Sequence, residues 1–290
     1  MKVLLTGASG QVGTALQASK PPEIELTALT HADLDLCHGA AVQAMLANRR
    51  PSLVINAAAY TAVDRAESDA ELAFAINAEG PRQLALAAKR LLDCRLIHIS
   101  TDYVFDGTAS DPYRPDHPQN PISVYGRSKL AGEQAVLEIL GEKAVVLRTA
   151  WIYAPQGRNF LLTMLRLMRE RGAVRVVADQ TGSPTSARSI AHAIWAIAAR
   201  SQVTGVLHWT DAGTASWYEF ASAIAAEAQL AGLMAQKAEV TPITTAEYPT
   251  SARRPPNSLL DTRQTIAALD LVPPSWRDEL HATILALKTA

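Results

Sequence analysis

The chain opens with a short apolar run that ends in a glycine-rich turn, and this feature constrains its fold more than any other. Residues 2–6, KVLLT, precede glycines at positions 7, 10 and 13, and a segment of helical composition follows over residues 11–19. Glycines permit a tight bend and let the backbone approach a pyrophosphate, while the helix N-terminus offers unpaired N–H groups. The unit predicts a dinucleotide-binding turn, with cofactor contacts at Gly7, Gly10, Gln11 and Val12.

Apolar runs continue to alternate with helical segments up to about residue 153. Runs at residues 24–30, 53–60, 95–105 and 144–153 indicate buried strands, and helices are expected over residues 39–49, 70–92 and 125–140. Strands that alternate with helices form parallel sheets with right-handed crossovers. We therefore predict an α/β chain whose residues 1–153 form a doubly wound parallel (Rossmann) sheet, the dinucleotide-binding domain.

The pattern is less regular beyond residue 153. Prolines at positions 184, 242, 249, 255 and 256 separate the helices expected at residues 159–171, 187–199, 217–231 and 276–287. Such punctuation favours loops around a binding cleft over additional sheet. We predict that residues 154–290 form mainly a smaller substrate-binding domain, from which some later segments return to the first domain.

The composition argues against several classes of function. The 290 residues carry 27 Lys and Arg against 28 Asp and Glu, so the net charge of −1 gives no attraction for nucleic acid or anionic membranes. Apolar runs are too short for a signal peptide or a membrane span. Cys37 and Cys94 lack metal-ligand spacing and are expected to be reduced thiols. We expect a cytoplasmic protein whose partner is a small molecule.

A possible proton donor lies at the start of the helix expected at residues 125–140. In VYGRSKLAGEQ, residues 124–134, Tyr125 precedes Lys129 by one helical turn, so both side chains share a face. A positive charge beside a phenol favours phenolate, and we expect Lys129 to lower the pKa of Tyr125. Thr101 ends the fourth expected strand, at the carboxyl edge where open α/β sheets hold ligands.

The cofactor type depends on the end of the second expected strand, at Thr30. NAD sites usually place an acidic residue there, which bonds the ribose 2′-hydroxyl and would repel a 2′-phosphate. Asp33 and Asp35 follow slightly late. A carboxylate is therefore expected to be absent from that position, which makes NADPH the slightly preferred cofactor while NADH stays possible.

Thr101, Tyr125 and Lys129 together resemble the catalytic triad of the extended short-chain dehydrogenases/reductases. Further segments occur in order along nearly the whole chain and are similar to the dTDP-4-dehydrorhamnose reductase family: VINAAAYTAVDRAE, NAEGPRQLA, STDYVFDG, YGRSKLAGE, RTAWIY, DQTGSPTSA and RRPPNSLLD. The resemblance implies reduction of the 4-keto group of dTDP-4-dehydro-L-rhamnose to dTDP-L-rhamnose with NADPH or NADH, in the synthesis of cell-envelope polysaccharide.

The resemblance also implies roles for individual residues. Tyr125 would protonate the carbonyl oxygen, Thr101 would hydrogen-bond it, and Lys129 would bind the nicotinamide ribose. Further cofactor contacts are implied at Asp35, Leu36, Ala57, Ala58 and Ala59. Contacts with the sugar nucleotide are implied at Thr61, Val63, Asp102, Tyr103, Trp151, Arg253 and Asn257.

Three alternative functions compete with this one. Related dehydratases carry Asp-Glu after the threonine, whereas this chain has Asp102-Tyr103, and a phenol is a poor base for elimination. Another sugar-nucleotide epimerase or reductase of the extended type remains an alternative. So does a non-catalytic, dinucleotide-binding regulatory subunit of the methionine adenosyltransferase type.

Metal and histidine chemistry is not expected. Some members of the family hold Mg²⁺ between subunits with glutamates, and the matching positions here are Ala15 and Arg188, which are unsuited to a hard cation. We predict no such metal, and both a monomer and a homodimer stay open. Lone histidines are more often packing residues than ligands, so no role is assigned to His98, His192, His208 or the neighbouring Trp209.

Overall fold

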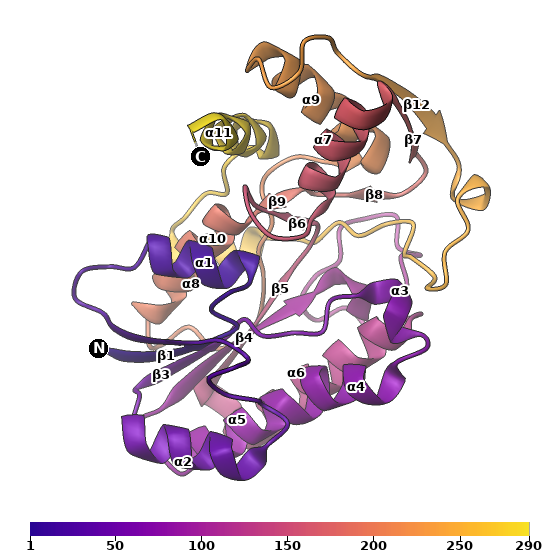
Figure 1. The fold of residues 1–290 in the computed structure, drawn as a ribbon. Coiled ribbons are helices and arrows are strands. Elements are labelled where there is room, and N and C mark those ends of the chain that lie inside the picture. Colours follow the sequence, from indigo (N-terminus) through magenta and orange to yellow (C-terminus); the bar gives the residue numbers. More distant parts are fainter. Residues whose placement is uncertain (290) are drawn as a thin grey trace.

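The computed structural model describes residues 1–289 and has an α/β fold built on one central sheet (Figure 1). This six-stranded sheet is parallel and has the order β2–β1–β3–β4–β5–β10. The strand order reverses beside β1, which lies between β2 and β3, and open α/β sheets bind ligands at such a switch point. The predicted Rossmann fold is confirmed. The strands are β1 (Lys2–Thr6), β2 (Glu25–Leu29), β3 (Leu53–Asn56), β4 (Arg95–Thr101), β5 (Ala144–Thr149) and β10 (Gly205–His208).

Helices cover both faces of this sheet, so its central strands are buried on both sides, as expected (Figure 1). Val3 and Leu5 of β1 pack with α1 (Gln11–Ala18) and α8 (Ala187–Ala198). Leu4 points to the opposite face, because successive side chains of a strand alternate. It packs there with residues of α2 (Gly39–Arg49), α5 (Gly80–Lys89) and α6 (Val124–Leu140).

The helix expected over residues 70–92 is interrupted and ends earlier, at Lys89. It consists of α4 (Ala70–Phe74), a π-helical turn η1 (Ala75–Glu79) and α5. The π turn presents Asn77, a fully buried residue whose amide exchanges hydrogen bonds with the backbone of Tyr60 and donates to Ser128 Oγ at 3.0 Å. Such turns often occur at functional sites. Here the interruption joins the loop after β3 to helix α6.

Residues after 153 build a second core and also return to the central sheet. Helices α7 (Phe160–Arg171), α9 (Trp217–Leu230) and α11 (Trp276–Thr289) pack around Tyr153 and Phe220. In contrast, α8 and β10 belong to the Rossmann layer, and α1 contacts α8 directly. A return of later segments was expected from the sequence, but the strand β10 itself was not.

The expectation of loops without further sheet in this half is wrong. Strands β7 (Ala173–Val177) and β12 (Glu239–Ile243) pair in parallel, and Pro242 lies within β12. Proline has no N–H to donate, which a two-stranded sheet tolerates because each strand has a free edge. The remaining elements are short: α3 (Val63–Ala66), η2 (Asp102–Val104), η3 (Gly141–Lys143), β6 (Ile152–Tyr153), β8 (Thr181–Gly182), β9 (Thr185–Ser186), β11 (Ala215–Ser216), η4 (Thr245–Glu247) and α10 (Arg263–Leu269).

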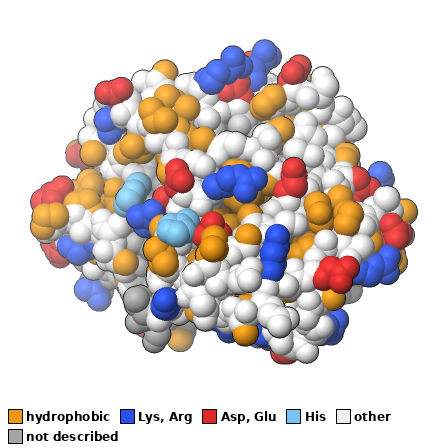
Figure 2. Space-filling view, turned by 90° about the horizontal axis from the view of Figure 1, so that it is seen from above, with side chains coloured by type: hydrophobic (Ala, Val, Ile, Leu, Met, Phe, Trp, Pro, Cys, Tyr) orange, Lys and Arg blue, Asp and Glu red, His pale blue; other side chains and the backbone are white. Residues whose placement is uncertain are grey.

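The surface agrees with the balanced composition. Figure 2 shows Lys and Arg side chains interspersed with Asp and Glu side chains on the face seen from above. A surface of mixed charge produces little long-range electrostatic attraction for a charged partner. Among residues 1–289, none of the helices combines the length and the apolar character needed to cross a bilayer.

Candidate active site

The glycine turn lies at the switch point, in close contact with the loop that follows β3. Gly7 has a φ of +74°, and a Cβ added there would come within 2.5 Å of the backbone of Ala57 and Ala58. A Cβ on Gly13 would lie 2.1 Å from the carbonyl oxygen of Gly7. The N-cap residue of α1 is Gly10, which has no side chain to cap the N–H groups of the first turn. These features fit a site for a dinucleotide pyrophosphate.

The other residues expected to contact the cofactor differ in their burial and in their hydrogen-bond partners. The side-chain oxygen Oε1 of Gln11 accepts a hydrogen bond from Asn159 Nδ2 at 2.8 Å. Val12 and Leu36 are buried in the hydrophobic clusters on the two faces of the sheet. Asp35 accepts a bond from the Cys37 N–H at 2.9 Å, which lowers the pKa of its carboxyl. Ala57, Ala58 and Ala59 are half-buried, and the backbone of Ala57 and Ala58 lies against the glycine turn; their contact with the cofactor stays a prediction.

The end of β2 carries a carboxylate that residue spacing did not predict. Asp33 turns back onto Thr30 and accepts hydrogen bonds from its N–H at 2.9 Å and its hydroxyl at 2.7 Å. Both bonds lower the pKa of the carboxyl, which is therefore ionised at neutral pH. The expectation that this position lacks a carboxylate is wrong, and it no longer supports a preference for NADPH.

Thr101 and Tyr125 meet at the carboxyl edge of the sheet. Thr101 ends β4 and donates a hydrogen bond from Oγ1 to Asp102 Oδ1 at 2.9 Å. Tyr125 lies in the first turn of α6, whose start is fixed by a bond from the Gly126 N–H to Ser123 Oγ. Burial raises the pKa of Tyr125 above its ordinary value, and the neighbouring Thr101 hydroxyl opposes this shift. The two hydroxyls can therefore act on one oxygen atom.

Lys129 lies one turn along α6, but its ammonium group is directed toward β4. Its Nζ donates to the carbonyl oxygen of Ile99 at 2.7 Å and lies 3.5 Å from His98 Nε2. Burial lowers the pKa of Lys129 to about 8. The expectation that Lys129 makes Tyr125 more acidic is wrong for the free protein, because burial of the phenol dominates its pKa.

Asp102 is the buried neighbour of this pair. Burial raises the pKa of its carboxyl to about 6, while hydrogen bonds from Ser258 and Thr101 oppose the shift. Its side chain is 2% exposed. Asp102 therefore orients Thr101 and has little surface left for a sugar.

A cavity of about 840 Å³ begins next to these residues. The ring of Tyr103 meets that of Tyr125 edge to face, with centroids 5.5 Å apart, and also lines the cavity. The walls come from α7, the start of α9, β7, β12 and the loop around residues 248–254, which contribute Phe160, Trp217 and Tyr248 together with Arg171, Arg175 and Arg254. Aromatic rings and cations in one cavity suit a ligand with a planar ring and negative charge.

Of the residues expected to contact the sugar nucleotide, Tyr103 lines this cavity, whereas its lining does not include Thr61, Val63, Asp102, Trp151, Arg253 or Asn257. Trp151, which has a φ of +47°, stacks on Trp217 with ring centroids 3.5 Å apart and 7° between the planes. Thr61 is exposed, and Val63 begins α3. The amide of Asn257 is used within the fold, where it donates to Ala109 O at 2.7 Å and accepts from the Leu259 N–H.

Sequence reasoning named Arg253 as a contact and did not name its neighbour Arg254. Arg253 is exposed, whereas Arg254 lines the cavity and pairs with Asp64 of α3 at 2.6 Å. Trp217 and Gln180 were also missed, although the Trp217 Nε1–H donates to Gln180 Oε1 and both residues line the cavity. Their positions depend on the β7–β12 pair, which the sequence did not predict.

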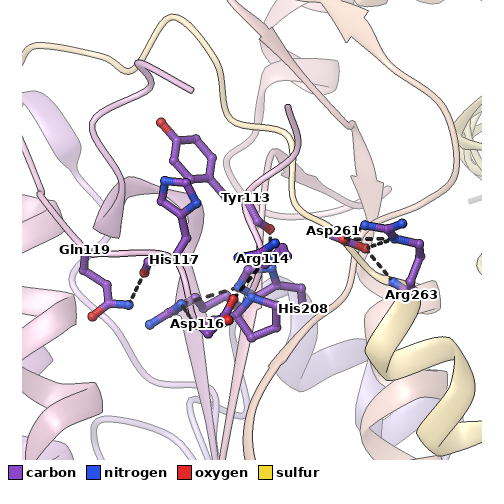
Figure 3. A network of polar contacts seen from close by, with 10 residues as sticks. Tyr113, Arg114, Asp116, His117, Gln119, His208, Asp261 and Arg263 are labelled. Atoms are coloured by element: carbon purple, nitrogen blue, oxygen red, sulfur yellow. Dashed lines mark hydrogen bonds and ion pairs between the residues drawn. The ribbon is translucent and has the colours of Figure 1, made fainter. Parts of the chain in front are cut away.

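A polar network holds the loop between η2 and α6 against the end of β10 (Figure 3). His208 of β10 donates from Nδ1 to the carbonyl oxygen of Tyr113 at 3.0 Å, and the Tyr113 and His117 rings meet edge to face. Asp261 pairs with Arg263 next to this loop, as Figure 3 shows. The network fixes the chain that runs from Thr101 to Tyr125.

The two positions that match metal ligands in some family members make other interactions. Ala15 packs against the core cluster that contains α8, and Arg188 pairs with Glu279 of α11 at 2.5 Å. Within the part of the chain that the structure describes, no group of three or more His, Cys, Asp or Glu residues is arranged to hold a metal.

Comparison with known proteins gives consistent matches over almost the full length. Residues 1–289 match the family model of the RmlD substrate binding domain. The dTDP-4-dehydrorhamnose reductase of Burkholderia thailandensis is 44% identical over 287 residues, which cover 96% of each protein. A Streptomyces antibioticus protein named as a probable dTDP-4,6-dihydroxy-2-methyloxan-3-one 4-ketoreductase is 45% identical over 261 residues, 90% of this chain and 86% of that protein.

A solved structure agrees with these relatives. The crystal structure of the Bacillus anthracis dTDP-4-dehydrorhamnose reductase in complex with NADP has a TM-score of 0.93 to this chain. The two chains share 37% sequence identity, and the match covers 98% of this chain and 99% of the other.

Proposed function

The chain belongs to the RmlD substrate binding domain family, and on that premise we propose that it reduces dTDP-4-dehydro-L-rhamnose to dTDP-L-rhamnose with NADPH. One observation carries this proposal: Thr101 and Tyr125 meet at the carboxyl edge of the sheet, and Tyr125 contacts Tyr103, which lines the cavity. A ketone placed there would contact both hydroxyls.

The cofactor site is assigned to the switch point of the sheet. NADPH supplies the hydride when it is bound. The glycine turn at residues 7–13 and the first turn of α1 would hold its pyrophosphate, because the N-cap Gly10 has no side chain to occupy the first N–H groups of the helix. Support for NADPH over NADH comes from the NADP-bound relative and not from the end of β2.

The proton is assigned to the phenol of Tyr125. Reduction of a ketone consumes one hydride and one proton, so the donor must be protonated when the hydride arrives. Burial raises the pKa of Tyr125 and keeps the phenol protonated at neutral pH. Thr101 donates to Asp102 Oδ1 in the free protein, and its hydroxyl would turn from this carboxylate to donate to the same oxygen and orient the carbonyl.

The sugar nucleotide is assigned to the cavity of about 840 Å³. Its aromatic walls suit the base, and Arg171, Arg175 and Arg254 are the candidates for the diphosphate. Trp217, backed by Trp151, is the best placed of the aromatic residues because their stacking keeps the ring rigid. Because Tyr103 lines the cavity and contacts Tyr125, the sugar end would lie beside the catalytic hydroxyls.

The test is to follow NADPH absorbance after adding dTDP-4-dehydro-L-rhamnose. We expect turnover by the parent chain and a loss of kcat of at least about 100-fold in Tyr125→Phe, because the proton donor is gone. Tyr218→Phe is the matched control, since Tyr218 packs partly buried on α9 in the second core. Equal rates in Tyr125→Phe and the parent would contradict the assigned role.

The regulatory alternative makes a different prediction for the same experiment. A regulatory subunit of the methionine adenosyltransferase type would bind the dinucleotide, show no turnover and bind the transferase tightly. We also propose a cytoplasmic location and a monomer or homodimer. Light scattering on the purified chain distinguishes these two oligomeric states.

A further inference from the structure

Four buried polar side chains form a continuous line across the sheet beneath the proposed cofactor site. Thr6, Asn56 and His98 are in register on β1, β3 and β4, and Lys129 of α6 follows them. Their exposed fractions are 2%, 0%, 0% and 2%. The line begins one residue before Gly7 and ends at a catalytic residue, so it joins the cofactor turn to the lysine.

The orientation of the Asn56 amide is fixed by its neighbours. Its Oδ1 accepts a hydrogen bond from the backbone N–H of Ala58 at 3.1 Å and one from the Thr6 hydroxyl at 2.7 Å. Because a backbone N–H only donates, the oxygen of the amide must face Ala58. The Nδ2 group then faces His98 Nδ1, at 3.0 Å, and donates to it.

This orientation selects the tautomer of His98. Since Nδ1 accepts a hydrogen bond, the proton of the neutral ring must be on Nε2. The ring is neutral because burial and the nearby Lys129 both lower the pKa of His98 well below its ordinary value. Its Nε2–H therefore faces Lys129 Nζ across 3.5 Å.

An N–H group directed at an amine has opposite effects on the neutral form and on the ammonium form of that amine. It can donate to the lone pair of a neutral amine, but it repels an ammonium ion. We propose that His98 is a positioning residue: its Nε2–H, fixed by Asn56, faces Lys129 Nζ and weakens the hold of this lysine on its proton. The carbonyl oxygen of Ile99, 2.7 Å from Nζ, keeps the amine in place in both states.

Other charged groups act on Lys129 from its own helix and from the sheet. Glu133, one turn further along α6, stabilises the ammonium, and Arg148 of β5 pairs with Glu133. Tyr125 precedes Lys129 on the same helix and is protonated at neutral pH. The balance between burial and His98 on one side and Glu133 on the other therefore sets the charge of Lys129 near neutral pH.

His98→Gln tests this inference directly, because the glutamine amide can turn its oxygen toward Lys129. We expect the pKa of Lys129 to rise by about one unit when an acceptor replaces the N–H donor. His98→Asn keeps a partner for Asn56 but no longer reaches Lys129, so a smaller rise is expected. Protein labelled with ¹³C at lysine Cε reports this pKa by NMR titration, and Lys129→Arg identifies the resonance.

His208→Gln is the matched control, because His208 is also fully buried and neutral but has Arg148, Tyr113 and Thr265 as its polar partners. The pKa of Lys129 should change much less in that variant, because His208 reaches Lys129 only through Arg148 and Glu133. An unchanged pKa in folded His98→Gln, or an equal rise in His208→Gln, would overturn the proposal.

The role in catalysis rests on the proposed function, and the two can fail separately. The NMR titration needs no substrate, so it tests His98 even in a chain that does not turn over. In an active chain, the alkaline limb of kcat should move to higher pH in His98→Gln by the same amount as the measured pKa. If His98→Gln turns over substrate but leaves both the alkaline limb of kcat and the pKa of Lys129 unchanged, the inference about His98 is refuted. The reductase assignment would then remain intact.

Discussion

Glu133→Gln is expected to destabilise the fold by about 3 kcal/mol, because it leaves the guanidinium of Arg148 buried without a counter-charge. The two side chains are 1% and 2% exposed. Arg148 Nε lies 3.0 Å and 3.1 Å from the two carboxylate oxygens, and Nη2 lies 2.7 Å from Oε2. This is a bidentate pair between the catalytic helix α6 and β5.

The magnitude follows from what the variant retains. Removing one partner of a buried pair costs about 3–5 kcal/mol. A glutamine oxygen still accepts one hydrogen bond, and the Pro115 carbonyl oxygen still accepts from Arg148 Nη1 at 3.1 Å, which places the loss at the lower end. The free energy of unfolding falls by about 3 kcal/mol per molar urea for a chain of this size, so the urea concentration at the unfolding midpoint should fall by about 1 M.

Urea unfolding followed by circular dichroism measures this loss, and Glu170→Gln provides the matched control. Glu170 pairs with Arg166 on α7, but the two side chains are 51% and 61% exposed, so the expected change is below about 0.5 kcal/mol. The double variant Glu133→Leu/Arg148→Met should recover most of the loss, because no buried charge remains. Equal midpoints for the two single variants would refute the reasoning.

The same substitution has a second expected effect, on Lys129. Glu133 stabilises the ammonium of Lys129, so its removal should lower the pKa of Lys129 and move the alkaline limb of activity to lower pH. This shift is opposite in sign to the one expected for His98→Gln. Opposite shifts from two neighbours of one amine are not expected from a general loosening of the fold.

Two further substitutions test the cofactor site. Gly13→Ala should weaken NADPH binding at least about tenfold in a fluorescence titration, since its Cβ would lie 2.1 Å from Gly7 O and force the turn open; unchanged affinity would show that the turn does not hold the pyrophosphate. Asp33→Asn should raise the ratio of kcat/KM for NADPH over NADH by about 3–10-fold, because it removes a charge beside the ribose position while keeping an acceptor for Thr30. A constant ratio in steady-state assays would place the 2′-phosphate elsewhere.

The elements that sequence reasoning predicted are those with a strong local pattern. β1, β3, β4 and β5 are apolar runs followed by helical segments, and this pattern is nearly sufficient to define a parallel sheet. Strand β10 was missed because Gly205–His208 is too short to show a period. Its strand conformation comes from pairing with β5, which is a tertiary contact and leaves no local signal.

In the site, too, residues within a local sequence pattern were predicted, whereas residues positioned by tertiary contacts were missed. Thr101, Tyr125 and Lys129 were identified because each lies at the end of a strand or in a helix that has a recognisable pattern. The carboxylate at the end of β2 was missed because Asp33 reaches Thr30 by a turn that spacing along a strand does not describe. The preference for Arg254 over Arg253 depends on its pairing with Asp64, which is distant in the sequence.

The sequence-based view of Tyr125 placed the emphasis on the acidity of the phenol, but the structure points to retention of its proton. In the free protein, burial raises the pKa of Tyr125, and the Lys129 ammonium is held at Ile99 O and not at the phenol. A reductase must begin its chemical step with the proton on the donor. The raised pKa meets this requirement, because it keeps the Tyr125 phenol fully protonated at neutral pH. The acidity that proton transfer requires must then arise during the reaction, from the hydrogen bond of Thr101 and from the charge of Lys129. Because His98 and Glu133 control that charge, the pH dependence of reduction should follow Lys129 and not Tyr125.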